Sequence, residues 1–224
     1  MARNESSKAR HGKQLERKFS RRASYDRILI VSEGSKTEPN YFNEIRAAFH
    51  LHTANVVVRP SELGTAPLQV VQYAKQLFLE GDRHRRIQAH AFDQVYAVFD
   101  RDDHESYFNA LQLAESLDRR LRNDNKQYIR FRAIPSVPSF ELWLLIHFEN
   151  IQSQIDRNEV LRRLKQRLPQ YEKGCKGTFA LTRDRLEAAY KQAEMLGRHN
   201  SGYTDPEPFT AVGNLVKLLT GLRT

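Results

Sequence analysis

The sequence has a single cysteine and no long apolar run, and each absence excludes a class of protein. Cys175 is the only cysteine among 224 residues, which excludes an internal disulfide framework and a zinc site built from several cysteines. No apolar run approaches the ~18 residues that a membrane-spanning helix needs, and the N-terminus lacks the apolar core of a signal peptide. We therefore expect a soluble, cytoplasmic protein without a membrane partner.

The chain also has no excess of negative charge. The 36 lysines and arginines outnumber the 27 aspartates and glutamates, so the formal net charge is +9 at pH 7. Such a balance favours attraction to polyanions, nucleic acid among them. Much of the excess lies in residues 1–26, a polar leader with too few apolar side chains to fold alone. The leader is either an electrostatic arm for phosphates or a solubilising tail.

The remainder of the chain alternates between strand-like and helix-like segments. Four apolar runs predict strands, and the segments between them have helical spacing. The predicted strands are 28–31, 55–59, 95–99 and 128–134. This order predicts an α/β fold with a mostly parallel four-stranded sheet flanked by helices. We expect this α/β domain over residues 27–150 and a basic helical extension, residues 151–224, packed on it.

The stretch QVYAVFDRDDH, residues 94–104, turns from a buried strand directly into carboxylates. Asp100 and Asp102 are two residues apart, so on an extended chain end their side chains point the same way. Ligands of open α/β sheets bind at the carboxyl ends of the strands, and magnesium is usually held by one or two carboxylates, water and phosphate oxygens. The pair therefore either binds such a cation or caps the following helix, where aspartate is favoured.

Two more strand ends carry a glutamate. Glu33 follows the first strand and faces the aspartates if the first and third strands are neighbours. A carboxylate in that position can have a pKa suited to general acid–base catalysis. The alternative for Glu33 is a loop side chain in solvent. Glu141 follows the fourth strand in the first turn of a helix, where it either steadies a second metal position or complements the helix dipole.

Basic side chains near these positions and in the extension are candidates for contact with phosphates. Residues 171–178 form a flexible, glycine-containing basic loop that either lies along a nucleic acid backbone or only connects two helices. Residues 160–168 predict an amphipathic helix with arginines on its polar face. The side chains expected to bind nucleic acid are Lys36, Arg101, Arg162, Arg163, Lys173 and Lys176.

Five motifs join these signals into a family resemblance. In chain order they are ILIVSEG, TEPNYF, VYAVFDRDDH, PSFELWLLIHFE and KGCKGTF. Together they resemble the RloB-like family and, within it, the Toprim fold over residues 27–145. The resemblance implies that Glu33 is the general acid–base and that Asp100 and Asp102 bind Mg²⁺ or Mn²⁺. Toprim motifs in general do not define a role for Glu141, which we assign to the metal site from its position at a strand end.

The resemblance also implies a function in bacterial or archaeal anti-phage defence. The expected activity is hydrolysis of phosphodiester bonds by a divalent-metal-dependent nuclease, with nucleic acid and defence-system proteins as partners. The alternatives are a non-catalytic nucleic-acid-binding or regulatory subunit and a Toprim enzyme that processes RNA. Three carboxylates of the catalytic type favour an enzyme. The sequence does not distinguish DNA from RNA as substrate, and it leaves open whether the chain forms a homo-oligomer.

Overall fold

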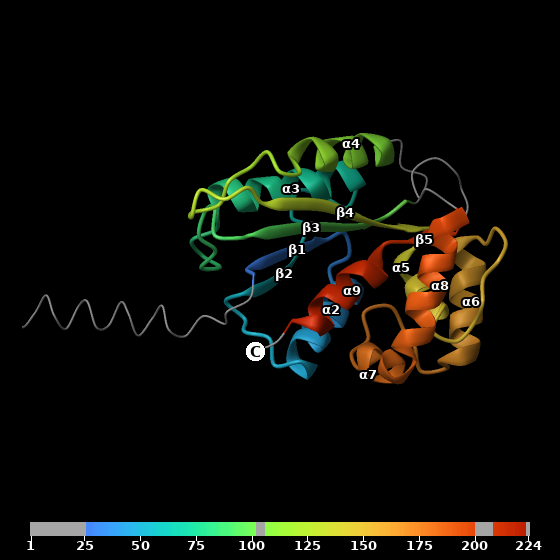
Figure 1. Cartoon of the computed structure of the whole chain (residues 1–224). Coiled ribbons are helices and arrows are strands. Elements are labelled where there is room, and N and C mark those ends of the chain that lie inside the picture. Colours follow the sequence, from blue (N-terminus) through green and yellow to red (C-terminus); the bar gives the residue numbers. More distant parts are fainter. Residues whose placement is uncertain (1–25, 102–105, 200–207, 223–224) are drawn as a thin grey trace, which may run out of the picture.

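The computed structural model describes residues 26–101, 106–199 and 208–222 (Figure 1). Within these residues, five strands form one sheet in the order β2-β1-β3-β4-β5. The strands are β1 (Ile28–Ser32), β2 (Val56–Pro60), β3 (Gln94–Asp100), β4 (Arg130–Val137) and β5 (Phe209–Thr210). The first four are parallel, and β5 pairs antiparallel with β4. The predicted α/β fold with a mostly parallel sheet and a C-terminal helical part is confirmed.

Helices cover both faces of the sheet (Figure 1). Two lie over one face, namely α3 (Pro67–Glu80) and α4 (Tyr107–Leu117). The other face is covered by α2 (Thr37–Ala48), α5 (Phe140–Leu145) and α9 (Val212–Gly221). Every residue of β1 and β3 is buried, which is why these central strands are continuous apolar runs rather than alternating ones.

The alternation of side chains along β1 divides the interior into two cores. Leu29 and Val31 pack with α3 and α4, whereas Ile28 and Ile30 pack with α2 and the C-terminal helices. Because successive strand residues point to opposite faces, one five-residue strand serves both layers.

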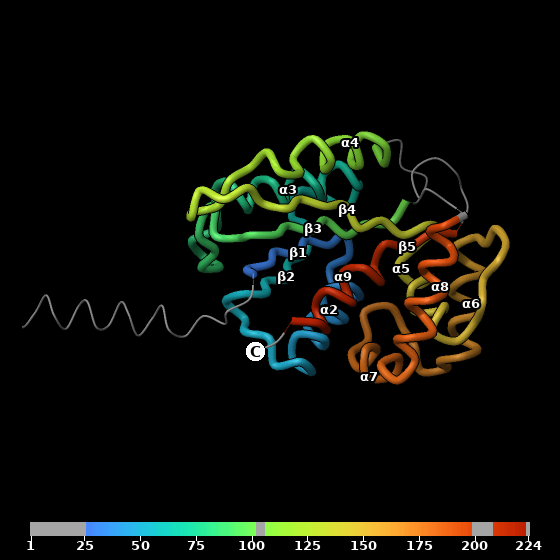
Figure 2. Tube along the Cα trace, in the orientation of Figure 1, coloured from blue at the N-terminus to red at the C-terminus, as the bar shows by residue number. Residues whose placement is uncertain are grey.

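The C-terminal helices share the second core instead of building their own. They comprise α6 (Arg157–Arg167), α7 (Thr178–Thr182), the 3₁₀ turn η1 (Arg183–Arg185), α8 (Leu186–His199) and α9. Trp143 of α5 is fully buried and donates its indole N–H to the Tyr41 hydroxyl of α2 at 2.9 Å. The last helix, α9, runs back beside α2 (Figure 2). The extension is therefore packed on the α/β part through a common core.

Three predicted elements differ from the structure. The helical spacing of residues 210–222 predicts a helix from residue 210, but Phe209–Thr210 form β5, a strand too short to produce a periodic pattern. The spacing of residues 105–123 predicts one helix, whereas α4 ends at Leu117, where the following Asp118 carboxylate accepts the Phe131 N–H at 3.0 Å. The spacing of residues 182–198 predicts a helix from residue 182, whereas α8 begins at Leu186, after α7 and η1.

No helix in the described ranges is long and apolar enough to span a membrane.

Candidate active site

The carboxyl ends of β1 and β3 lie next to each other at one edge of the sheet. The two strands are parallel neighbours, with Ser32 opposite Val98. The residue that follows β1, Glu33, donates its backbone N–H to the Val98 carbonyl at 2.9 Å. Its side-chain Oε2 accepts the backbone N–H of Asp100, also at 2.9 Å. The predicted proximity of Glu33 and Asp100 is therefore confirmed, and strand pairing holds the Glu33 carboxylate against the end of β3.

A buried glutamate at the start of α2 joins them, and the sequence analysis did not select it. Glu38 is 5% exposed and its Oε1 accepts the Gly34 N–H at 3.3 Å. A Cβ atom at residue 34 would lie 2.1 Å from Glu38 Oε2, so a side chain there would displace the carboxylate from its present position. In the sequence, a glutamate in a first helical turn is explained by the helix dipole alone. Its burial depends on the β1–α2 turn folding over it.

Glu141 completes the acidic cluster, by which we mean Glu33, Glu38, Asp100 and Glu141. It lies in the first turn of α5, after β4, and is 3% exposed. Its Oε2 accepts the Ser139 hydroxyl at 2.7 Å, and its Oε1 accepts the Tyr171 hydroxyl at 3.2 Å. Lys173 Nζ lies 3.5 Å from the same Oε1. Burial and the adjacent Glu141 raise the pKa of Tyr171, which keeps its hydroxyl a donor.

The cations near this cluster neutralise its four carboxylates only in part. Burial, followed by the charges of Glu38, Glu33 and Glu141, raises the pKa of Asp100 well above its ordinary value. Burial, followed by the charges of Glu33 and Glu141, raises the pKa of Glu38 to about 7. The opposing contribution to Asp100 comes from Arg157, whose Nη2 lies 3.1 Å from Asp100 Oδ2. A group of carboxylates with this excess charge is suited to a further cation.

The basic loop 171–178 is attached to α2 rather than free. Gly174 donates its N–H to Thr37 Oγ1 at 3.0 Å and accepts from Asn40 Nδ2 at 2.9 Å. The Glu44 carboxylate accepts the N–H groups of Gly177 and Phe179 at 2.6 and 2.8 Å. The expectation of a flexible connection is therefore replaced by a loop hydrogen-bonded along one helix. This attachment brings Tyr171 and Lys173 of the extension to the carboxylates of the sheet.

The predicted basic residues separate into two groups. Lys36 is exposed and packs against Gly174, where an added Cβ would lie 2.8 Å from the Lys36 Cβ, and Lys173 lies beside Glu141. Arg101 directly follows Asp100, with its guanidinium 5.4 Å from the centre of the Tyr107 ring. These three are close to the acidic cluster in space or in the chain.

The other basic residues have different surroundings. Arg162 pairs with Glu159 at 2.7 Å, and Arg163 pairs with Glu149. Both arginines thus face acidic side chains of the extension itself. Lys176 is exposed in the attached loop.

The second residue of the predicted metal pair, Asp102, lies outside the described residues. Among the residues that the structure does describe, no three histidine, cysteine, aspartate or glutamate side chains are arranged to hold a metal ion together. Magnesium does not require such a cage, because it is commonly held by one or two carboxylates with water and substrate phosphates. The oxygen-only donors of the acidic cluster match that chemistry, and Asp100 and Glu38 are the members whose pKa is raised by burial and by neighbouring carboxylates.

The fold and the site together define a class of protein. It is a mostly parallel α/β protein whose buried carboxylates collect at the carboxyl edge of the sheet, where proteins of this architecture bind ligands. Within that class, the sequence family described as RloB-like protein matches residues 28–219. The chain therefore belongs to the RloB-like family, as its motifs predict. No curated protein and no solved structure is significantly similar to it.

Proposed function

We propose that this protein is a divalent-metal-dependent nuclease that hydrolyses phosphodiester bonds in nucleic acid, and that it acts in anti-phage defence. The observation that carries the proposal is the convergence of Glu33 of the β1–α2 turn, Glu38 of α2, Asp100 of β3 and Glu141 of α5. They meet at the edge of the sheet where α/β proteins bind ligands. The likeness of the motifs to Toprim enzymes supports the choice of phosphodiester chemistry, and the RloB-like family supports the biological setting.

Asp100, with Asp102 and Glu38 as its companions, holds the Mg²⁺ or Mn²⁺ ion in this proposal. A bound divalent ion neutralises charge on the scissile phosphate and lowers the pKa of an attacking water. Glu33 moves the proton as general acid–base. Its orientation is set by the hydrogen bond that its Oε2 accepts from the Asp100 backbone N–H. Ser139 and Tyr171 orient Glu141 at the border of the same site.

Lysines from two parts of the chain supply the contacts to the substrate backbone. Lys36 lies at the start of α2 and Lys173 in the loop attached to that helix. Both are exposed, and Lys173 Nζ also lies 3.5 Å from the buried Glu141, which holds its ammonium group at the border of the acidic cluster. The net charge of +9 adds a long-range attraction to a polyanion.

One observation favours a different function, that of a non-catalytic nucleic-acid-binding subunit. Asp100 forms an ion pair with Arg157, and such a pair is a sufficient structural reason for a buried aspartate. This alternative predicts salt-sensitive binding of nucleic acid without turnover.

Cleavage assays on three substrates test the proposal. We would incubate the protein with plasmid DNA, single-stranded DNA and total tRNA, in Mg²⁺, Mn²⁺ or EDTA. We expect cleavage of at least one substrate that EDTA abolishes, and losses of at least ~100-fold in Asp100→Ala and Glu33→Gln. Glu115→Gln, an exposed change on α4, is the matched control and retains full activity.

The outcomes separate the alternatives. Cleavage that survives in both variants comes from a contaminating nuclease and contradicts the assignment. Nucleic acid binding with no cleavage in any metal, and no Mn²⁺ binding by the wild type, supports the binding subunit. The three substrates also decide between DNA and RNA, and activity on tRNA alone supports an RNA-processing enzyme.

A further inference from the structure

One arginine of the extension forms an ion pair with a member of the acidic cluster. Arg157 is the first residue of α6, and the preceding Asp156 caps that helix by accepting the N–H groups of Asn158 and Glu159 at 2.8 and 3.0 Å. The cap fixes where α6 begins and thereby directs Arg157 toward β3. Its Nη2 donates to Asp100 Oδ2 at 3.1 Å.

The two partners of this ion pair differ in their access to solvent. The Asp100 side chain is 7% exposed, whereas the Arg157 side chain is 39% exposed. The guanidinium is therefore the partner that lies on the solvent side of the pair. The planar fork of a guanidinium matches the oxygens of a phosphate as well as those of a carboxylate.

Arg157 and a divalent ion would draw on the same carboxylate oxygens. Asp100 is the proposed metal ligand, and its Oδ2 is the atom that Arg157 contacts. Two cations on one carboxylate repel each other, so a bound ion weakens the hold of Asp100 on the guanidinium. A phosphate that arrives with its own negative charge offers the released guanidinium a new partner a short distance away.

We propose that Arg157 is a substrate-binding residue of the active site, which neutralises Asp100 in the metal-free protein and moves to the scissile phosphate when a divalent ion binds Asp100. This inference rests on the proposed nuclease function. It gives the C-terminal extension a direct part in the chemistry, because α6 would supply a residue that the sheet does not contain.

A purely structural ion pair makes a different prediction. In that case, loss of Arg157 leaves Asp100 buried without its cation, lowers the stability of the metal-free protein and does not affect the bound phosphate. The exchange that we propose moves two quantities in opposite directions: removal of Arg157 strengthens metal binding and weakens catalysis.

The test is Mn²⁺ titration by calorimetry together with single-turnover cleavage, on the full chain. The variants are Arg157→Ala and Arg157→Lys, with Arg198→Ala as control. Arg198 forms an exposed ion pair with Glu194 at 2.6 Å on α8, so its loss removes one arginine–carboxylate pair outside the acidic cluster. Circular dichroism confirms that each variant is folded.

We expect Arg157→Ala to bind Mn²⁺ about 3-fold more tightly than the wild type, because a competing charge is gone. We expect its cleavage rate at saturating Mn²⁺ to fall by ~100-fold, because the phosphate loses a positioned donor. Arg157→Lys keeps the charge without the planar fork, so its values fall between those of the alanine variant and the wild type. Arg198→Ala matches the wild type in both assays.

Each other result overturns the inference in a recognisable way. If the wild type binds Mn²⁺ and cleaves, and both Arg157 variants do the same with unchanged constants, Arg157 is structural and the proposed nuclease function stands. Weaker Mn²⁺ binding by Arg157→Ala also overturns it, because the arginine would then support the metal site instead of competing for it. If the wild type neither binds Mn²⁺ nor cleaves, the nuclease function fails and this inference fails with it.

Discussion

At the scale of single residues, His147 is a buried histidine whose surroundings define its role. His147 follows α5 and is 2% exposed, and its Nδ1 lies 2.8 Å from the Trp143 carbonyl. Within the described chain its Nε2 has no hydrogen-bond partner. The ring packs edge-to-face on Trp143, with centroids 4.7 Å apart. This environment is that of a packed core residue.

The burial of His147 predicts a pH dependence of stability. Burial lowers the pKa of His147 from its ordinary 6.5 to about 4 in the folded protein. As the pH falls below 6.5, the unfolded chain takes up the proton first, so stability that is complete above pH 6.5 is lost as the pH approaches 4. We expect up to ~3 kcal/mol of this loss to disappear in His147→Leu. Urea unfolding of both proteins between pH 7.5 and 4.5 measures it.

The comparison of slopes decides the result, because other groups titrate in the same range. Both proteins share those groups, so only the difference between the two curves reports His147. Parallel curves from pH 7.5 to 4.5 would show that the imidazole is not held neutral in the fold.

Glu38 shows the limit of sequence analysis at the residue scale. The sequence places this glutamate five residues after Glu33 and in the first turn of a predicted helix, and both facts have an ordinary explanation. Nothing local distinguishes an exposed first-turn glutamate from a buried one. The distinguishing feature is Gly34, where the absence of a side chain lets the Glu38 carboxylate fold under the turn.

At the scale of elements, α2 is the point of attachment for the extension. Glu44 accepts two backbone N–H groups, those of Gly177 and Phe179, one on each carboxylate oxygen. These N–H groups belong to the start of α7, so Glu44 acts as an N-terminal cap supplied by another helix. A carboxylate at a helix N-terminus also gains from the helix dipole.

We predict that Glu44→Ala destabilises the protein by about 1–3 kcal/mol, because two N–H groups lose a charged acceptor. The exposed change Glu115→Ala on α4 stays within about 0.5 kcal/mol of the wild type. Chemical denaturation followed by fluorescence of Trp143, the only tryptophan, measures both. A loss in Glu44→Ala no larger than in the control would mean that the loop is held by its other contacts.

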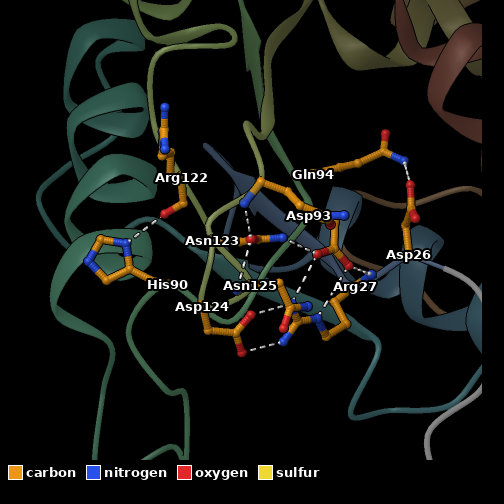
Figure 3. Close-up of polar contacts among 10 residues, drawn as sticks. Asp26, Arg27, His90, Asp93, Gln94, Arg122, Asn123, Asp124 and Asn125 are labelled. Atoms are coloured by element: carbon orange, nitrogen blue, oxygen red, sulfur yellow. Dashed lines mark hydrogen bonds and ion pairs between the residues drawn. The ribbon is translucent and has the colours of Figure 1, made fainter.

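At the scale of the whole molecule, the two ends of the parallel strands differ: the acidic cluster lies at the carboxyl ends, and an ion-pair network joins the amino ends. At the amino ends, Arg27 forms ion pairs with two aspartates, and Figure 3 shows its guanidinium between them. Arg27 Nη2 lies 3.0 Å from Asp93 and 2.6 Å from Asp124, and Asn123 Nδ2 donates to Asp93 at 2.7 Å. The hydrogen bond to Asp124 is the largest contribution that raises the pKa of Arg27 above its already high ordinary value.

This network joins the segments that enter three strands. Arg27 precedes β1, Asp93 precedes β3, and Asn123 and Asp124 belong to the connection that leads into β4. We predict that Arg27→Leu lowers the free energy of unfolding by about 3 kcal/mol, because two partly buried carboxylates lose their cation. Because the change is at the amino ends of the strands, Mn²⁺ affinity per folded molecule stays at the wild-type value.

Denaturant titration and Mn²⁺ calorimetry on the same preparation provide both numbers. The prediction is wrong if Arg27→Leu unfolds at the wild-type midpoint, or if its Mn²⁺ affinity falls while the protein remains folded. The second result would show that the two ends of the strands are coupled through the sheet.

The sequence by itself determined the strands of the sheet core and three of the four carboxylates of the acidic cluster, all except Glu38. Ile28–Ser32 and Gln94–Asp100 are continuous apolar segments that end in turn or acidic residues, so local composition identifies both. Parallel strands bring their carboxyl ends to one edge, which is sufficient to predict that Glu33 and Asp100 lie together. These conclusions need only the period of the pattern and the order of the elements.

Only the tertiary structure decided the rest, because the remaining contacts join residues that no local pattern connects. Arg157 and Asp100 are 57 residues apart, and Ser136 and Thr210, which face each other across β4 and β5, are 74 apart. A sequence pattern reports which face of an element is apolar, but it does not report which distant element packs there. The burial of Glu38, the attachment of the loop at Gly174 and the pairing of Arg157 all depend on that packing.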